Sequence, residues 1–328
     1  MPRAVARPRV VISGGAGFIG SHLAEALVSE ADVVLVDHLG AGKREDAASA
    51  VAAGATLVKR DLLRGDLRPL FRKVDTVYHL AANPDVRLDK EGPKAHVEQN
   101  VMMTYRVLEA CRVNRVRRIV FASTSTVYGE AKVVPTPEEY GPMEPISLYG
   151  ATKLACESLL YAYAHTFGMQ AVVFRMANVC GGRSGHGVVP DLVRKLLKDP
   201  KRLEIIGSEP GTSKSYTYID DVLAGFRAGL AAAQGPVVVY NLGSVDAISV
   251  REIADALCDE LHLDGVQYRW TGGSGAGRGW VGDVRVMGLA IDRLKATGWV
   301  PRFTSEQAVR RAAKDAWERF ARKPSRSR

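Results

Sequence analysis

The chain has 328 residues, of which 46% are apolar and 25% charged, and its mean hydropathy is -0.06. These values describe a soluble globular chain with ample material for a core. No stretch approaches the roughly 18 uninterrupted apolar residues that a membrane span needs, and the N-terminus shows no cleavable apolar region. We therefore expect a cytoplasmic protein with no membrane partner.

The net charge of +9 comes from the two ends of the chain. Residues 1–9 carry three arginines and no acid, and residues 310–328 carry eight basic residues against two acidic ones, so the body between them is neutral. A neutral body argues against a basic groove that follows phosphates. We expect solvated basic tails and no nucleic-acid partner.

The four cysteines lie far apart, with no CxxC or Cys/His ligand spacing. This pattern suggests neither a disulfide framework nor a zinc site, so we expect no metal. We predict that all four are reduced thiols in the core: Cys111, Cys156, Cys180 and Cys258.

Short β-branched runs alternate with longer helical patterns through the first half of the chain. The runs cover residues 10–13, 33–37, 56–58, 76–79, 118–123 and 171–175. Such alternation predicts an α/β fold with a doubly wound parallel sheet of the Rossmann type.

After about residue 176 the pattern becomes less regular. We expect a helix at 189–198, a strand at 203–206 and a Gly-rich stretch at 272–282, whereas 222–243 returns to the sheet. The sequence thus predicts a Rossmann domain formed by residues 1–176 plus about 219–248. A smaller, discontinuous α/β domain takes about 177–218 plus 249–328.

A glycine-rich loop follows the first strand directly and opens an amphipathic helix. In its G-x-x-G-x-x-G spacing, Gly14 allows the tight turn, Gly17 lets the backbone approach phosphates and Gly20 permits close packing of helix on strand. The amides at the helix N-terminus, at Phe18 and Ile19, can then face a pyrophosphate. This arrangement predicts a dinucleotide site.

Acidic residues after the second and third strands favour NAD over NADP. Asp37 stands where a carboxylate would accept hydrogen bonds from an adenosine ribose and would repel a phosphate. Lys43 and Arg44 weaken this preference slightly, unless they belong to a solvated loop. Asp61 could bind the adenine amine or simply cap a turn.

Tyr149 and Lys153 stand one turn apart on the same face of a predicted helix. A tyrosine that acts as a base near pH 7 needs its pKa lowered by roughly three units, or about 4 kcal/mol. The Lys153 ammonium and an oxidised nicotinamide can supply this. The hydroxyls of residues 123–126, at the end of the fifth strand, would hydrogen-bond the reacting oxygen.

At this point the chain resembles the extended short-chain dehydrogenases/reductases, and among them the NAD-dependent nucleotide-sugar epimerase/dehydratase group. The matching segments, in chain order, are GGAGFIG (14–20), YHLAA (78–82), FASTSTVYG (121–129), YGATK (149–153), RMANV (175–179) and SYTYIDD (215–221). By this resemblance Thr124 is the catalytic hydroxyl, Tyr149 the base and Lys153 its partner. The resemblance also implies tightly bound NAD, with contacts from Gly14, Gly17, Phe18, Ile19, Gly20, Asp37, His38, Asp61, Leu62, Leu80, Ala81, Ala82, Tyr149 and Lys153.

The residues after Thr124 indicate the reaction type. Dehydratases of this group carry an acidic pair or a Glu there, because eliminating water needs an extra acid and base. Here Ser125 and Thr126 occupy these positions, and the segment looks like the SxTVYG of UDP-hexose 4-epimerases. The resemblance therefore favours an isomerase of the UDP-glucose/UDP-galactose type, which works through a transient 4-keto sugar.

The second domain is expected to bind the nucleotide sugar, which makes a UDP-sugar the partner. The substrate contacts that the resemblance implies are Thr124, Ser125, Thr126, Asn178, Arg183, Val189, Lys214, Tyr216 and Arg278. Val189 could instead be core, and Lys214 and Arg278 could be exposed. Lys214-Ser215 also departs from the Arg-Asp of many relatives, and a lysine cannot form the forked contact of an arginine with a diphosphate.

Three alternatives remain open at the level of sequence. Arg183 could meet a sugar carboxylate, so a UDP-glucuronate 4-epimerase is possible, as is a UDP-N-acetylhexosamine 4-epimerase. A nucleotide-sugar ketoreductase, dehydrogenase or dehydratase of the same family would use the same Thr, Tyr and Lys. The family also usually dimerises through a four-helix bundle, here from residues 94–114 and 149–167, with Ala155, Leu159, Ala162 and Tyr163 on the shared face or packed on the sheet.

Overall fold

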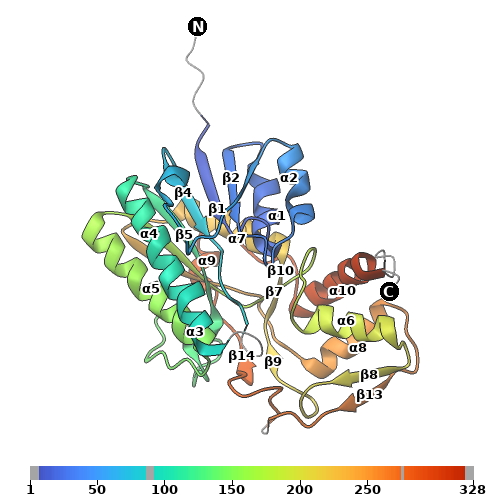
Figure 1. Cartoon of the computed structure of the whole chain (residues 1–328). Coiled ribbons are helices and arrows are strands. Elements are labelled where there is room, and N and C mark those ends of the chain that lie inside the picture. The colour runs from blue at the N-terminus through green and yellow to red at the C-terminus, as the bar shows by residue number, and fades with distance from the viewer. Residues whose placement is uncertain (1–6, 86–91, 275–276, 322–328) are drawn as a thin grey trace. The chain divides into compact units, whose positions relative to one another are not determined.

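The computed structural model describes residues 7–85, 92–274 and 277–321 (Figure 1). Contacts between residues divide the chain into two compact units. The first comprises Met1–Val127, Leu148–Arg175 and Gly229–Tyr240, and the second comprises Tyr128–Ser147, Met176–Ala228 and Asn241–Arg328.

A seven-stranded sheet in the order β11-β6-β5-β4-β1-β2-β3 forms the centre of the first unit. Its strands are β1 (Arg9–Ser13), β2 (Asp32–Asp37), β3 (Thr56–Lys59), β4 (Thr76–His79), β5 (Arg118–Thr124), β6 (Gln170–Met176) and β11 (Val237–Leu242). The pairs β1–β2, β1–β4, β2–β3 and β4–β5 are all parallel. The doubly wound α/β prediction is confirmed.

Helices cover both faces of this sheet (Figure 1). They are α1 (Phe18–Leu27), α2 (Ala48–Ala52), α3 (Gly92–His96), α4 (Met103–Val113) and α5 (Leu148–Phe167), with a π-helical turn at Val97–Met102 and 3-10 turns at Arg44–Ala47, Arg68–Phe71 and Ser125–Tyr128. Val107 and Leu108 of α4 and Leu160 of α5 are buried in one apolar cluster with Val11 and Phe121 of the sheet. This cluster fixes α5, which carries Tyr149 and Lys153, to the sheet.

The second unit is built from short strands and three longer packed helices. Its strands are β7 (Asn178–Cys180), β8 (Arg202–Ile205), β9 (Ser213–Lys214), β10 (Tyr216–Tyr218), β12 (Ile248–Ser249), β13 (Gln267–Trp270) and β14 (Val286–Met287). They form the sheets β10-β7, β12-β9-β14 and β13-β8. The helices are α6 (Val188–Lys198), α7 (Ile219–Ala232), α8 (Val250–Glu260), α9 (Asp292–Lys295) and α10 (Ser305–Ala321), of which α6, α8 and α10 pack together.

The prediction of a solvated basic tail is wrong for residues 310–321. They belong to α10, whose residues Ala308, Val309, Ala312, Ala313 and Ala316 are buried. This helical spacing of small apolar residues buries one face and leaves the basic residues on the other. The expected tails at residues 1–6 and 322–328 lie outside the described residues.

The contacts group some segments differently from the predicted domains. Residues 128–147, 219–228 and 241–248 fall in the second unit, although the sequence suggested the Rossmann domain. Hydrogen bonds of Asn241 explain why residues 128–147 group with the second unit. Asn241 accepts a hydrogen bond from Tyr128 Oη (2.8 Å). Its Nδ2 donates to Thr136 O (2.9 Å), and its backbone N donates to Glu138 Oε1 (2.8 Å).

The remaining expectations from composition concern cysteines, metals and membranes. All four cysteines are buried and free, as predicted. In the part of the chain that the structure describes, no cluster of His, Cys, Asp and Glu could hold a metal ion. Among the same residues, no helix combines the length and apolar character that crossing a bilayer requires.

Candidate active site

The predicted cofactor and catalytic residues of the first unit gather at one edge of the sheet. Residues 14–20, 37–38, 61–62, 80–82 and 124–126 stand at or just after the carboxyl ends of β1, β2, β3, β4 and β5. Because these strands are parallel neighbours, their ends share an edge. The chain passes from β1 to β2 on one side and later to β4 on the other, and such a switch point is where doubly wound sheets bind ligands.

The glycine loop leaves room for backbone alone. Gly14 has a φ of +72°, and a Cβ there would lie 2.8 Å from Ala81 N; a Cβ at Gly20 would lie 2.2 Å from Gly14 O. Gly17 caps α1 without a side-chain hydrogen bond from any described residue. The first amides of α1, at Phe18 and Ile19, are thus free of a side-chain cap, as binding of the NAD pyrophosphate requires.

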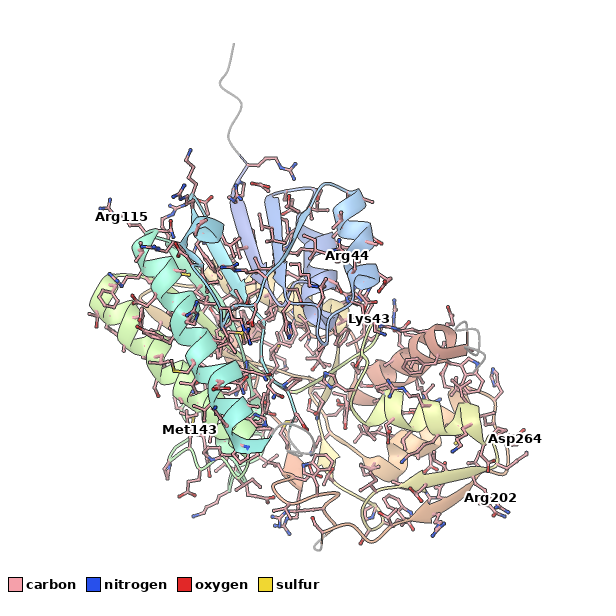
Figure 2. The ribbon with its side chains drawn as sticks, viewed as in Figure 1. Lys43, Arg44, Arg115, Met143, Arg202 and Asp264 are labelled. Atoms are coloured by element: carbon pink, nitrogen blue, oxygen red, sulfur yellow. The ribbon has the colours of Figure 1, made fainter. Side chains whose placement is uncertain are left out.

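Asp37 is placed to accept the hydroxyls of a ribose. Its side chain is buried; Oδ2 accepts a hydrogen bond from Ala16 N (3.1 Å) and Oδ1 from Leu39 N (2.8 Å). A carboxylate oxygen can accept a second hydrogen bond, so capacity remains for a ribose, whereas a phosphate would be repelled. Lys43 and Arg44 are exposed, as the solvated-loop interpretation expects (Figure 2). The residues present therefore fit NAD.

The other predicted cofactor residues differ in their surroundings. His38 is exposed, with Nδ1 3.6 Å from Asp37 Oδ1. Asp61 caps a turn through Leu63 N (2.8 Å), which is the structural alternative, and contact with adenine stays a prediction. Leu62 is buried in the apolar cluster that α4 and α5 share with the sheet. Leu80, Ala81 and Ala82 form the half-buried segment after β4.

Thr124, Tyr149 and Lys153 come together in the first unit. Thr124 ends β5, and a side-chain hydrogen bond joins it to Tyr149 near the start of α5. Lys153, one turn later, is buried; its Nζ donates to Ala122 O (2.8 Å) and lies 4.5 Å from the centre of the Phe121 ring. Thr124 Oγ1 is also 3.1 Å from Thr126 Oγ1. A hydroxyl, a phenol and an ammonium are thus within one small volume.

Burial moves the pKa of Tyr149 and that of Lys153 in opposite directions. It raises the pKa of Tyr149 to about 12, although the hydrogen bond with Thr124 lowers it in part. It lowers the pKa of Lys153 to about 8, although Cys156 and Glu157 raise it in part. The sequence predicts that Lys153 and an oxidised nicotinamide together lower the pKa of Tyr149; in the chain alone, burial raises it. Ionisation of Tyr149 near pH 7 thus requires about 7 kcal/mol rather than 4.

Several buried polar residues near this site had no role assigned from the sequence. Asn100 lies in the π-helical turn; its Oδ1 accepts from Asn83 N (2.8 Å) and its Nδ2 donates to Thr152 Oγ1 (2.9 Å). His79 hydrogen-bonds Ser13 Oγ (2.7 Å) through Nδ1 and Thr104 Oγ1 (2.9 Å) through Nε2. Burial lowers the pKa of His79 to about 3, so the ring is neutral.

In the second unit, the predicted diphosphate ligands already have internal partners. Lys214 forms an ion pair with the buried Asp283 and lies 5.6 Å from the centre of the Trp280 ring. Arg278 donates from Nε to Asp283 O (3.0 Å) and from Nη2 to Glu130 Oε1 (3.0 Å). The sequence does not identify Asp283 or Glu130 as partners of these cations. The signals present are weak: Asp283 follows Arg278 by five residues, and Glu130 directly follows the segment 121–129.

The other substrate candidates of the second unit differ in their exposure. Asn178 begins β7, and its Nδ2 donates to Ser215 O (3.2 Å). Val189 is 2% exposed, as its core interpretation expects, and Tyr216 is buried, which raises its pKa. Arg183 is half-buried in the segment between β7 and α6. Val189 and Tyr216 are thus the buried candidates, whereas Asn178, Arg183, Lys214 and Arg278 are half-buried.

Known proteins resemble the chain along most of its length. The UDP-glucose 4-epimerase of Azospirillum brasilense is 30% identical over 336 residues, which cover 96% of this chain and 93% of the relative. A crystal structure of a UDP-galactose 4-epimerase is 41% identical with a TM-score of 0.84, over 95% of this chain and 99% of that one. A UDP-glucuronic acid 4-epimerase from Bacillus cereus, in complex with UDP-glucuronic acid and NAD, is 28% identical with a TM-score of 0.85, over 94% and 99%.

The family assignment comes from a match over most of the chain. The sequence model of the NAD dependent epimerase/dehydratase family matches residues 10–243, which include the glycine loop, Asp37, Thr124, Tyr149 and Lys153. Together with the fit of the first unit to NAD, this match shows that the chain belongs to the NAD-dependent epimerase/dehydratase family.

Proposed function

We propose that the chain is an NAD-dependent nucleotide-sugar 4-epimerase of the UDP-glucose/UDP-galactose type. The observation that carries the proposal is the convergence of Thr124, Tyr149 and Lys153, followed by the hydroxyl residues Ser125 and Thr126 instead of acids. Loss of water from the sugar would need an extra acid and base, whereas oxidation and reduction at C4 need neither. The names of the relatives above support the same reaction.

The roles of the three residues follow from their surroundings. Tyr149 takes the proton from the sugar O4 and later returns it, while Thr124 hydrogen-bonds both the phenol and O4. Lys153 holds a positive charge beside the phenolate. Bound NAD would supply the acceptor and later the donor of the C4 hydride, and the positive charge of its oxidised ring would favour the phenolate.

We assign cofactor binding to the first unit and binding of the nucleotide sugar to the second. Lys214 and Arg278 are the cations that would bind the diphosphate, in exchange for Asp283 and Glu130. Arg183 is the residue that would select the sugar. A UDP-glucuronate 4-epimerase is the second candidate, because Arg183 supplies a half-buried guanidinium and a solved UDP-glucuronic acid 4-epimerase has this fold.

NMR spectra of the purified protein with UDP-galactose, UDP-N-acetylgalactosamine and UDP-glucuronate, mixed separately and without added cofactor, test the reaction. Conversion of one of them to its C4 epimer is expected, and it would also demonstrate retained NAD. Tyr149→Phe and Lys153→Met are each expected to abolish turnover while the circular dichroism spectrum stays unchanged. No conversion even after NAD is supplied, or full activity of Tyr149→Phe, would refute the proposal.

We also propose a homodimer that forms a four-helix bundle from α4 and α5. Large apolar side chains remain 42 to 51% exposed on and beside these helices: Val97, Met102, Tyr105, Val113, Tyr161 and Phe167. Of the predicted face, Ala155 and Ala162 are exposed and Leu159 is half-buried, whereas Tyr163 is buried and donates from Oη to Glu109 (2.7 Å). Tyr163 therefore does not belong to that face.

Light scattering after size-exclusion chromatography tests the dimer. Met102→Lys is expected to give a monomer, because an ammonium would be buried in the bundle. Val51→Lys on α2 is the matched control, since Val51 is 41% exposed on a different helix. A monomeric wild-type protein, or a dimer that tolerates Met102→Lys as well as Val51→Lys, would exclude the bundle.

We retain a cytoplasmic location as a proposal. Four buried, free thiols are compatible with a reducing compartment. Fractionation of cells followed by detection of the protein is expected to find it in the cytoplasmic fraction, and recovery from the membrane fraction would contradict this.

A further inference from the structure

A buried ion pair joins α5, which carries Tyr149 and Lys153, to β6. Glu157, one turn after Lys153 on α5, is 2% exposed, as is Arg175 near the end of β6. Arg175 donates to both carboxylate oxygens of Glu157, from Nη2 to Oε2 (2.7 Å) and from Nε to Oε1 and Oε2 (3.2 Å each). Ser123 donates its hydroxyl to Oε1. No role was assigned to this pair from the sequence.

Two successive residues of β5 are bonded to α5 through these side chains. Lys153 donates to Ala122 O, and Ser123 donates to Glu157. The next residue of β5 is Thr124, whose side chain hydrogen-bonds Tyr149. The contacts of Lys153 and Glu157 therefore fix the height of α5 against β5 at the level where Thr124 and Tyr149 meet.

We propose that Glu157, held by Arg175 and Ser123, is a positioning residue that sets Lys153 against β5 and keeps its ammonium charged. This inference rests on the proposed function for its catalytic consequence, but its structural part concerns Lys153 alone. Arg175 is the anchor: its forked guanidinium fixes the plane of the carboxylate in a way that a lysine could not.

The charges around Lys153 support this role. The groups around Lys153 come from three strands and from its own helix. β5 contributes the Ala122 carbonyl and the Phe121 ring, β4 contributes His79, and β6 contributes Arg175, which is paired with Glu157. Along α5 stand Tyr149, Cys156 and Glu157. Burial keeps His79, Tyr149 and Cys156 neutral near pH 7. Cys156 and then Glu157 oppose the effect of burial on the pKa of Lys153. Because the Cys156 thiol is neutral near pH 7, the carboxylate of Glu157 is the negative charge among these groups that offsets the cost of burying an ammonium.

The double variant Glu157→Gln/Arg175→Met provides the sharpest test. It removes both charges with side chains of similar size, and replacing a buried ion pair by a neutral one is often tolerated, whereas removal of one partner leaves an unpaired buried charge. The readout is the pKa of Lys153, measured by NMR of the protein carrying ¹³C at the lysine ε-carbon, with Lys153→Met to assign the signal. A second readout is the alkaline limb of the kcat/KM profile.

In the double variant, the pKa of Lys153 and the pKa of the alkaline limb are each expected to be lower by at least about half a unit. At a pH well above the pKa, this lowers the charged fraction of Lys153 about threefold. Ser158→Ala, at an exposed position of the same helix, keeps both charges and the contacts of Glu157 and is expected to leave the pKa unchanged. A folded double variant with an unchanged pKa of Lys153 would overturn the proposal. If the double variant does not fold, Arg175→Lys provides the test. This variant keeps the charges but loses the forked contact with Glu157, so kcat is expected to fall at least fivefold. A wild-type kcat would overturn the positioning role.

The two proposals can fail separately. If the wild-type protein does not epimerise any UDP-sugar, the proposed function is refuted, but the NMR titration of Lys153 still measures the effect of Glu157. If the wild type epimerises and the titration is unmoved, only the role of Glu157 is refuted.

Discussion

Substitution of Gly20 by alanine should destabilise the first unit, even though alanine is the better helix former. In an ordinary helical position the change would stabilise by about 1 kcal/mol. Here the new Cβ would lie 2.2 Å from Gly14 O and 2.9 Å from Gly15 Cα, closer than Cβ atoms approach other heavy atoms. Both contacts are with backbone, so no side chain can rotate away. Overpacking of this kind costs about 1 to 3 kcal/mol or more, and here it is expected to outweigh the gain.

Gly17→Ala in the same loop is the matched comparison. Its Cβ would meet only Gly14 O, at 3.2 Å, and its φ of -79° suits alanine. We expect a loss of stability below about 1 kcal/mol, because glycine is a better N-cap than alanine. Retention of NAD should suffer instead, since a methyl group would stand where the backbone approaches the pyrophosphate.

Thermal unfolding followed by circular dichroism, and NAD released on denaturation, measure the two effects. A net loss of up to about 2 kcal/mol lowers Tm by up to roughly 8 °C for a folding unit of this size. Gly20→Ala should therefore melt earlier than both the wild type and Gly17→Ala. If it melted at or above the wild-type temperature, the argument from close packing of α1 on the loop would be wrong.

Three further predictions concern charge. His79 has a pKa of about 3 in the folded chain and 6.5 in the unfolded chain, so on acidification the unfolded chain binds a proton first. The free energy of unfolding of the wild type should therefore fall by about 2 kcal/mol from pH 6.5 to pH 5. Denaturant titrations of His79→Gln should show a weaker dependence of this free energy on pH. Lys153, whose pKa falls from 10.5 to about 8, should make the wild type gain about 3 kcal/mol relative to Lys153→Met between pH 7 and 10; equal slopes would contradict this. Asp37→Ala should weaken NAD binding at least tenfold in a fluorescence titration, and wild-type affinity would exclude a ribose contact.

The sheet and the cofactor edge could be predicted because their signals are local. The continuous apolar run at 33–36 is buried throughout, which is typical of a strand in a parallel sheet covered on both faces, so it indicates strand and fold class together. The end of each parallel strand then fixes where the following residues gather. Topology alone therefore predicts that Gly14, Asp37 and Thr124 lie at one edge.

The partners of the second unit could not be predicted in the same way. Lys214 and Asp283 are 69 residues apart, and Arg278 and Glu130 are 148 apart. No periodicity links such residues, so a cation at a substrate position gives no sign of the carboxylate that it contacts. Helix α10 was mispredicted as a solvated tail for a related reason. Its many charged residues indicate exposure, but the small apolar residues between them are enough to bury one face.

Burial favours the neutral form of both candidate catalytic side chains, and this limits the charge that the chain alone can place on Tyr149. It favours the phenol of Tyr149 and the neutral amine of Lys153, so each charged form needs an opposite charge nearby. Glu157 can support the ammonium, but a carboxylate opposes a phenolate. Ionisation of Tyr149 therefore requires a positive charge beyond that of Lys153, which an oxidised dinucleotide at the glycine loop would bring. A free enzyme should then keep Tyr149 protonated through neutral pH, so that its base becomes active only with the cofactor in place.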